Sequence, residues 1–206
     1  MEPDHQLRPL AGPLRDLVNW LDKRGDPYAI IGGVAACLQS KVRATADIDV
    51  VISTDETKLD ALVADAKAHG FTPRRADPVG FAAVNRIVLL THLGDEINVD
   101  MSLADLAFER ELIAKAKRIA ALGVRVPLAR PEELIAMKVL AFRNRDVRDI
   151  ESLLDAHPRI NLKQVTRWVT LLAVAAEQPE ILDRLESVLR ARRRTAPSRR
   201  PRRRKQ

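Results

Sequence analysis

Apolar positions in the first 130 residues follow both helical and extended spacings. Leu14, Leu17 and Leu21 recur one turn apart and Gly25 provides a stop, which predicts a helix over residues 13–25. Short runs rich in β-branched residues, bounded by turn-forming residues, predict strands, and the stretches between them predict helices. The expected strands are residues 28–31, 47–52, 86–91, 97–102 and 124–128, with helices over 34–40 and from Thr54 or Asp55 to about His69.

The pattern becomes purely helical after Pro131. This proline and the two glutamates that follow it suit the start of a helix over residues 131–143. Further helices are expected to begin at Asp146, Asn161 and Pro179. We therefore predict an α+β fold, in which a small mixed β-sheet flanked by helices precedes a helical domain. The expected boundaries are residues 1–129 for the α+β domain, 130–192 for the helical domain and 193–206 for a basic tail.

Charge is distributed unevenly along the chain. The net charge is +7, yet the segment from Arg190 to Gln206 carries nine arginines, one lysine and no acid, so the other residues together carry −3. The end of this segment is too polar and proline-interrupted to fold alone, which predicts disorder. Such a tail either tethers RNA through its phosphates or raises solubility, and without aromatic residues it cannot stack on bases.

Neither a membrane span nor thiol chemistry is favoured. The longest uncharged apolar stretch, residues 169–176, is too short to cross a bilayer, and the first ten residues lack the apolar core of a signal peptide. The single cysteine, Cys37, cannot form an internal disulfide and suits a small buried position within GGVAAC. We therefore expect a cytoplasmic protein without a membrane partner.

The stretch RATADIDVVI places two acids at the start of a strongly apolar strand. Because side chains alternate along a strand, Asp47 and Asp49 share one face, with Cα atoms ~6.6 Å apart. Two bare carboxylates about 5 Å apart repel by roughly 3 kcal/mol at an effective dielectric of 20. Open water, protonation of one acid or a bound cation relieves that repulsion. The apolar run that follows favours a central strand and hence a cation, and Mg²⁺ prefers oxygen ligands.

Two neighbouring features strengthen the case for a phosphate and metal site. Gly32 and Gly33 precede a short helix, where they either form a tight turn or let backbone N–H groups approach a phosphate. Asp100 alternates with the apolar Ile97 and Val99, so it is either an ordinary solvent-facing acid or a third carboxylate beside the pair. Three carboxylates from two strands can hold two Mg²⁺ ions ~3.5–4 Å apart for phosphoryl chemistry.

The segment IIGGVAACLQSKVRATADIDVVI resembles the nucleotidyltransferase superfamily typified by DNA polymerase β. It is most similar to the branch that contains the AbiEii toxins and the MenT toxins of mycobacteria. The shared pattern is Gly-Gly, a short helix and R-x-T-x-D-I-D on a strand. The later PEELIAMKVLAFRNRDVRDIESLL resembles the same branch, in which a helix lysine precedes an R-D-x-x-D-[IL] segment. The likeness covers about residues 28–154.

The resemblance implies roles for particular residues of this chain. Asp47, Asp49 and Asp100 would be metal ligands, with Asp100 also assisting deprotonation of the acceptor hydroxyl. Lys138 would bind the phosphates of a nucleoside triphosphate (NTP). Many members have serine where this chain has Gly33, which offers only its backbone. The remaining implied contacts to the nucleotide or the acceptor are Gly32, Gly33, Arg43, Thr45, Asp146 and Asp149.

Lys138 stands out without the resemblance, because it is the only charged residue from Leu134 to Phe142. In a helix that is apolar all round, a lysine must reach the surface, pair with an acid or face a polar cavity. Asp146 and Asp149 have a structural alternative as the cap and a first-turn acid of the next helix.

These observations predict a Mg²⁺-dependent enzyme that transfers a nucleoside monophosphate (NMP) from an NTP to an acceptor hydroxyl and releases pyrophosphate. Toxins of the resembled branch modify tRNA 3′ ends, so the resemblance implies tRNA as a substrate and a cognate antitoxin as a partner. One alternative is a transferase acting on a small aminoglycoside-type molecule. The other is a catalytically inactive RNA-binding or antitoxin-like protein.

Overall fold

The computed structural model describes residues 7–41 and 45–195. Arg43, to which the sequence analysis assigns a nucleotide contact, lies outside these residues. The same holds for the predicted disorder of the tail beyond Thr195.

A seven-stranded mixed sheet forms the centre of the N-terminal part, in the order β3-β4-β5-β2-β1-β7-β6. The pairs β2–β5 and β1–β7 are parallel and the other neighbours are antiparallel. The strands are β1 (Tyr28–Ile31), β2 (Asp47–Ile52), β3 (Phe71–Pro73), β4 (Ile87–His92), β5 (Asn98–Leu103), β6 (Lys117–Ala121) and β7 (Val124–Leu128).

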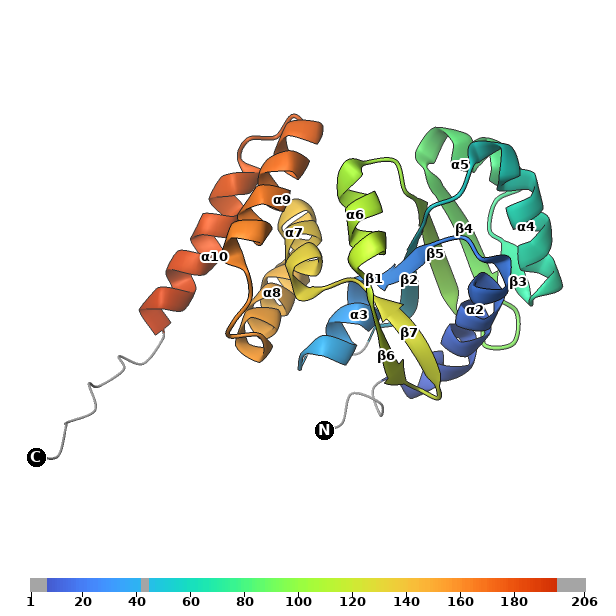
Figure 1. Cartoon of the computed structure of the whole chain (residues 1–206), viewed down its shortest axis with the longest axis horizontal. Helices are drawn as coiled ribbons and strands as arrows, with labels where there is room; N and C mark the ends of the chain where they lie inside the picture. The colour runs from blue at the N-terminus through green and yellow to red at the C-terminus, as the bar shows by residue number, and fades with distance from the viewer. Residues whose placement is uncertain (1–6, 42–44, 196–206) are drawn as a thin grey trace, which may run out of the picture.

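Helices flank this sheet and then form the C-terminal part alone. Figure 1 shows α7 to α10 gathered at one end of the molecule, while α2 and α4 lie at the other end. The α-helices are α2 (Ala11–Arg24), α3 (Gly32–Gln39), α4 (Leu59–Ala68), α5 (Pro78–Asn85), α6 (Ala107–Lys115), α7 (Pro131–Ala141), α8 (Asn144–Ala156), α9 (Leu162–Ala175) and α10 (Ile181–Thr195), with 3₁₀ turns η1 (Arg8–Leu10) and η2 (Glu56–Lys58). The predicted α+β class is confirmed.

All five predicted strands are present, and the segments 86–91 and 97–102 pair as the expected antiparallel hairpin. Asn161 caps α9 as predicted, accepting a hydrogen bond from the Gln164 N–H. The predicted start of α8 at Asp146 is wrong, because the helix begins at Asn144. The Asp146 carboxylate nevertheless caps it from the first turn by accepting the Arg143 N–H at 2.9 Å.

The core explains why β2 is central. The side chains of Ile48, Val50 and Ile52 are fully buried, and so is most of the neighbouring β1. β2 lies between β1 and β5, so both of its edges are hydrogen-bonded. The expectation of a central strand is confirmed. The half-buried Asp47 and Asp49 at its start therefore lie at the edge of the hydrophobic core. Cys37 is buried in this core, also as expected.

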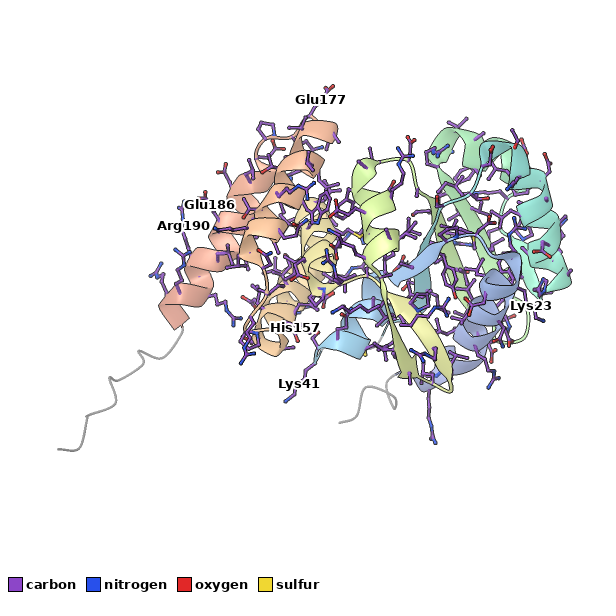
Figure 2. All side chains as sticks on the ribbon, in the orientation of Figure 1. Lys23, Lys41, His157, Glu177, Glu186 and Arg190 are labelled. Atoms are coloured by element: carbon purple, nitrogen blue, oxygen red, sulfur yellow. The ribbon has the colours of Figure 1, made fainter. Side chains whose placement is uncertain are left out.

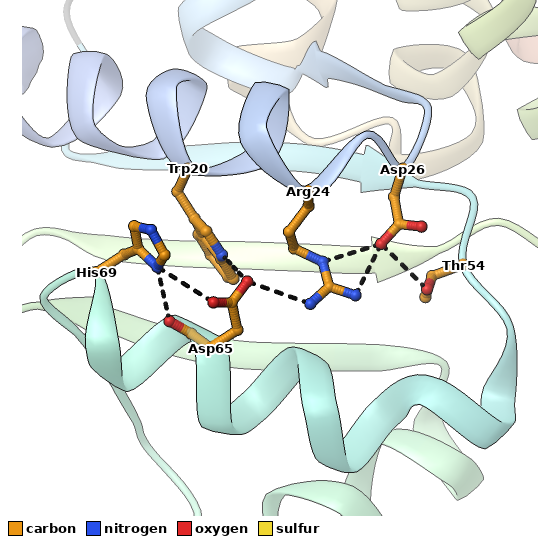
Figure 3. Close-up of polar contacts among 6 residues, drawn as sticks. All are labelled: Trp20, Arg24, Asp26, Thr54, Asp65 and His69. Atoms are coloured by element: carbon orange, nitrogen blue, oxygen red, sulfur yellow. Dashed lines mark hydrogen bonds and ion pairs between the residues drawn. The ribbon is translucent and has the colours of Figure 1, made fainter.

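A polar network links α2 to α4 on the side of the sheet shown in Figure 3. Asp65 accepts hydrogen bonds from the Trp20 indole at 2.7 Å and from Arg24 at 3.2 Å. Arg24 also bonds to Asp26, which accepts the Thr54 hydroxyl at 3.4 Å. The network joins the first helix to the segment that follows β2. No helix in the described ranges is long and apolar enough to cross a membrane.

Candidate functional site

Strand pairing brings the three predicted carboxylates to one place. β2 and β5 run parallel with Asp49 opposite Asp100 and Asp47 opposite Asn98. Ile48, which lies between Asp47 and Asp49 on β2, is buried in the core, so the two aspartates project from the opposite face of the strand. All three acids line a cavity of about 450 Å³, which we call the carboxylate cavity.

The glycines at the start of α3 are required by close packing against these acids. Gly32 has a positive φ of 62°, and a Cβ there would lie 1.9 Å from the Asp49 Oδ2. A Cβ on Gly33 would lie 2.5 Å from the Thr45 hydroxyl oxygen. A serine in place of Gly33 would therefore collide with Thr45 in this arrangement.

Two of the three carboxylates have polar side-chain partners. The Thr45 hydroxyl donates to the Asp47 Oδ1 at 2.6 Å. The guanidinium of Arg74, in the loop between β3 and α5, forms an ion pair with the Asp100 Oδ1. These contacts orient Asp47 and Asp100, which both line the carboxylate cavity.

Asp49 is the most perturbed member of the group. Burial raises its pKa to about 6, with further increases from the negative charges of Asp47 and Asp100. A hydrogen bond from the Gly33 N–H and the positive charge of Lys138 oppose this shift. The repulsion predicted from the D-x-D sequence is therefore present, and a cation among the carboxylates would relieve it.

The opposite wall of the cavity comes from α7, from α8 and from the residues between them. It carries basic as well as acidic side chains, together with apolar residues from α7. The described lining residues are Ile31, Gly32, Gly33, Thr45, Asp47, Asp49, Asp100, Leu134, Met137, Lys138, Ala141, Arg143, Arg145, Asp146 and Asp149.

Lys138 combines two of the three arrangements expected for it. Its ammonium lies 2.5 Å from the Asp149 Oδ2 and 3.8 Å from the Asp146 Oδ1, and all three residues are buried. It also lines the carboxylate cavity. The contacts fasten α7 to α8, which gives this lysine a structural role as well as a place in the site.

The donor set suits a hard divalent cation, because every candidate ligand is a carboxylate oxygen. In the part of the chain that the structure describes, no three acidic, histidine or cysteine side chains converge closely enough to hold a metal ion as they stand. Asp100, one of the three carboxylates, is paired with Arg74 in this arrangement.

Nine of the ten predicted site residues line this one cavity, and Arg43 lies outside the described residues. Sequence analysis did not identify Arg74, Arg143 or Arg145. Arg145 is the first residue of the R-D-x-x-D segment and Arg143 lies two residues before it, so both could have been considered. Arg74 carries no local signal, because it reaches Asp100 only through the pairing of β3, β4 and β5.

Comparisons with known proteins identify the family and the fold. A model of the family described as nucleotidyltransferase of unknown function (DUF6036) matches residues 12–181. No curated protein matches the chain.

Three solved structures share the fold. The solution structure of the antibiotic-resistance factor ANT(2″)-Ia has a TM-score of 0.53 and 19% identity, covering 89% of this chain and 97% of that one. A crystal structure of ANT(2″)-Ia with adenylyl-2″-tobramycin has a TM-score of 0.53 and 19% identity, and the match covers 81% of this chain and 98% of that one. The crystal structure of an antigenic nucleotidyltransferase-like protein from Paracoccidioides brasiliensis has a TM-score of 0.54 and 23% identity. The match covers 88% of this chain and 92% of that one.

The family model spans most of the chain, including β1, β2, β5 and the helices that complete the carboxylate cavity. This chain therefore belongs to the DUF6036 nucleotidyltransferase family, and it is an enzyme of the nucleotidyltransferase superfamily.

Proposed function

We propose that the protein is a Mg²⁺-dependent transferase that moves an NMP from an NTP to an acceptor hydroxyl. The observation that supports this most strongly is the division of the carboxylate cavity into two walls. Asp47, Asp49 and Asp100 form the strand wall, while Arg143 and Arg145 stand on the helix wall. A metal-bound triphosphate needs both kinds of group, carboxylates for its metal and cations for its phosphates.

In this proposal Asp47, Asp49 and Asp100 would hold the metal. Asp100 would release its ion pair with Arg74 when it binds the metal. When bound, Mg²⁺ supplies positive charge that offsets the negative charge of the carboxylates and phosphates. Asp100 also accepts the proton of the acceptor hydroxyl. Thr45 orients Asp47 through the hydrogen bond already present.

The phosphates would lie between the first turn of α3 and Lys138 of α7. Gly32 and Gly33 leave the first turn of α3 without side chains, so a phosphate can approach the backbone. Lys138 has three N–H donors, of which Asp149 and Asp146 occupy at most two. The third donates to a phosphate oxygen, while the two acids position the ammonium.

We propose the 3′ end of tRNA as the acceptor. The likeness of residues 28–154 to the AbiEii and MenT toxins supports it, and so does the Arg-rich segment that begins at Arg190. A toxin of this kind has a cognate antitoxin, which would be the protein partner.

A second candidate acceptor is an aminoglycoside. The shared fold with ANT(2″)-Ia, whose structure with adenylyl-2″-tobramycin is known, supports it. The carboxylate cavity also carries five acids against three cations, so it attracts a cationic molecule.

The test is incubation of the full chain with each of four NTPs labelled at the α-phosphate, together with total tRNA or with tobramycin. Label should enter tRNA with the wild type, disappear with Asp49→Ala and persist with Asp60→Ala, a control at an exposed acid of α4. Label in tobramycin alone would select the second acceptor. Label in neither, with every NTP, would contradict both.

A further inference from the structure

A second and larger cavity, of about 690 Å³, lies where the sheet meets the helical part of the chain. We call it the basic cavity. It is formed by the end of α3, strands β6 and β7, the start of α7 and the turn after α8. Its described lining residues are Gln39, Lys117, Ile119, Leu128, Arg130, Pro131, Glu132, Ala156, His157, Pro158, Arg159 and Ile160.

The two cavities lie at opposite ends of the same three helices. α3 begins with Gly32 in the carboxylate cavity and ends with Gln39 in the basic cavity, a length of about 12 Å. α7 runs from the basic cavity to the carboxylate cavity, and α8 runs from the carboxylate cavity back to the basic cavity. These helices contact one another, so a packed layer of three helices separates the two sites.

The charges of the basic cavity are not balanced by its own acids. Glu132, its single described acidic lining residue, accepts the backbone N–H of Asn161 at 3.1 Å. Arg130 is paired with Glu133. Within the described residues, Lys117 and Arg159 are exposed and form no ion pair, so their charges are available to an anion.

The arginine-rich end of α10 adjoins this cavity. Arg192 forms an ion pair with Asp155 and donates to the Leu154 carbonyl at 3.2 Å, at the last turn of α8. Ala156 and His157, which follow directly in the chain, line the cavity. Exposed Arg193 and Arg194 therefore extend the same positive region.

We infer that the basic cavity binds the phosphodiester backbone of a single-stranded polynucleotide acceptor, whose end lies in the carboxylate cavity. This inference rests on the proposed function and adds a second contact region to it. Several cations along one path suit a chain of phosphates better than a single small anion. No Phe, Tyr or Trp lines the cavity among its described residues, so it follows the backbone without stacking on bases.

The experiment measures the binding of a fluorescent 12-nucleotide RNA, and of DNA of the same sequence, to the full chain by anisotropy at several salt concentrations. The test variant is Lys117→Glu with Arg159→Glu, and Lys117→Gln with Arg159→Gln is a milder second version. The control is Lys23→Glu with Lys67→Glu, two exposed lysines on α2 and α4. Figure 2 shows Lys23 at the end of the molecule opposite to Arg190.

We expect the test variant to bind RNA roughly 20-fold more weakly at 0.1 M salt, since each lost contact removes about 0.7 from the slope of log affinity against log salt. The control should stay within twofold of the wild type. Equal weakening for RNA and DNA assigns the contact to phosphates, and weakening for RNA alone adds a contact to the ribose. Wild-type affinity in both test variants would overturn the inference. Magnesium-dependent NTP binding, measured in parallel, reports on the proposed function separately.

Discussion

The carboxylate cavity and the basic cavity share three helices but differ in how their charges are held. In the carboxylate cavity nearly every acid has a fixed partner, such as Thr45 for Asp47, Arg74 for Asp100 and Lys138 for Asp149. In the basic cavity, Lys117 and Arg159 are exposed and form no ion pair among the described residues. Groups with fixed partners suit the geometry that chemistry requires, whereas exposed cations without an ion pair suit attraction of a polyanion.

Because the two cavities have different proposed roles, transfer activity reports on the carboxylate cavity and polynucleotide affinity reports on the basic cavity. A substitution in the carboxylate cavity should change transfer and leave polynucleotide affinity alone. A substitution in the basic cavity should weaken polynucleotide affinity and should lower transfer only at acceptor concentrations that no longer saturate the protein. The predictions below follow this division, from the largest expected effect to the smallest.

Asp47→Asn should reduce NMP transfer on the order of 10³-fold, because it removes a charge where the metal and phosphates meet. Its affinity for a 12-nucleotide RNA should change by less than about twofold, since the basic cavity is untouched. Initial rates of labelled NMP incorporation and RNA anisotropy measure the two effects, with Asp60→Asn as the exposed control. Equal losses in both assays would show that the two cavities do not act separately.

Lys138→Met should lower the free energy of unfolding by about 3 kcal/mol, because it leaves the buried Asp149 without its partner. Lys115→Met, which breaks an exposed i,i+4 pair with Glu111, should cost less than about 0.5 kcal/mol. Urea unfolding followed by circular dichroism compares the two. A similar small loss in both variants would mean that Lys138 does not fasten α7 to α8.

Asp49→Asn should stabilise the metal-free protein at pH 7.5 by about 3 kcal/mol while abolishing transfer. The raised pKa of Asp49 means that the native protein binds more protons than the unfolded chain between about pH 4 and pH 6. Stability contributed by the protonated group is therefore present below that window and is lost as the pH rises through it. The gain from asparagine should vanish at pH 4, in urea unfolding with EDTA at the two pH values. A gain that is independent of pH would rule out this origin.

Arg145→Gln should weaken NTP binding about tenfold, through loss of one charge-assisted hydrogen bond to phosphate. The same change at Arg148, an exposed arginine of α8 outside the described cavity lining, is the matched control. Both should leave the salt dependence of RNA binding unchanged. Calorimetric titration with Mg²⁺ present measures the affinities, and equal affinities in the two variants would remove Arg145 from the phosphate wall.

Much of the carboxylate cavity was predictable because its parts follow local rules. Alternation on a strand places Asp47 and Asp49 on one face, and the same rule sets Asp100 apart from Ile97 and Val99. The Gly-Gly pair indicated a tight turn or a phosphate contact, whereas the packing of Asp49 against Gly32 is seen only in the structure. The fold class was likewise readable from the change of spacing near Pro131.

The missing parts depend on contacts between distant segments. β3 has three residues and ends in Pro73, and β6 is largely exposed, so neither shows the apolar signal of a buried strand. Arg74 reaches Asp100 because β3 is an edge strand two positions from β5. Lys117 and Arg159 come together only when β6 and the end of α8 meet. Sequence analysis did not predict α5 or α6 either.

The central claim is that the carboxylate cavity binds an NTP through a divalent metal. Isothermal titration of each non-cleavable NTP analogue into the full chain, with MgCl₂ or with EDTA, tests it most directly. The account predicts heat of binding for at least one analogue with Mg²⁺, none with EDTA and none with Asp47→Asn. Binding of equal strength in EDTA, or no binding of any analogue with Mg²⁺, would contradict it.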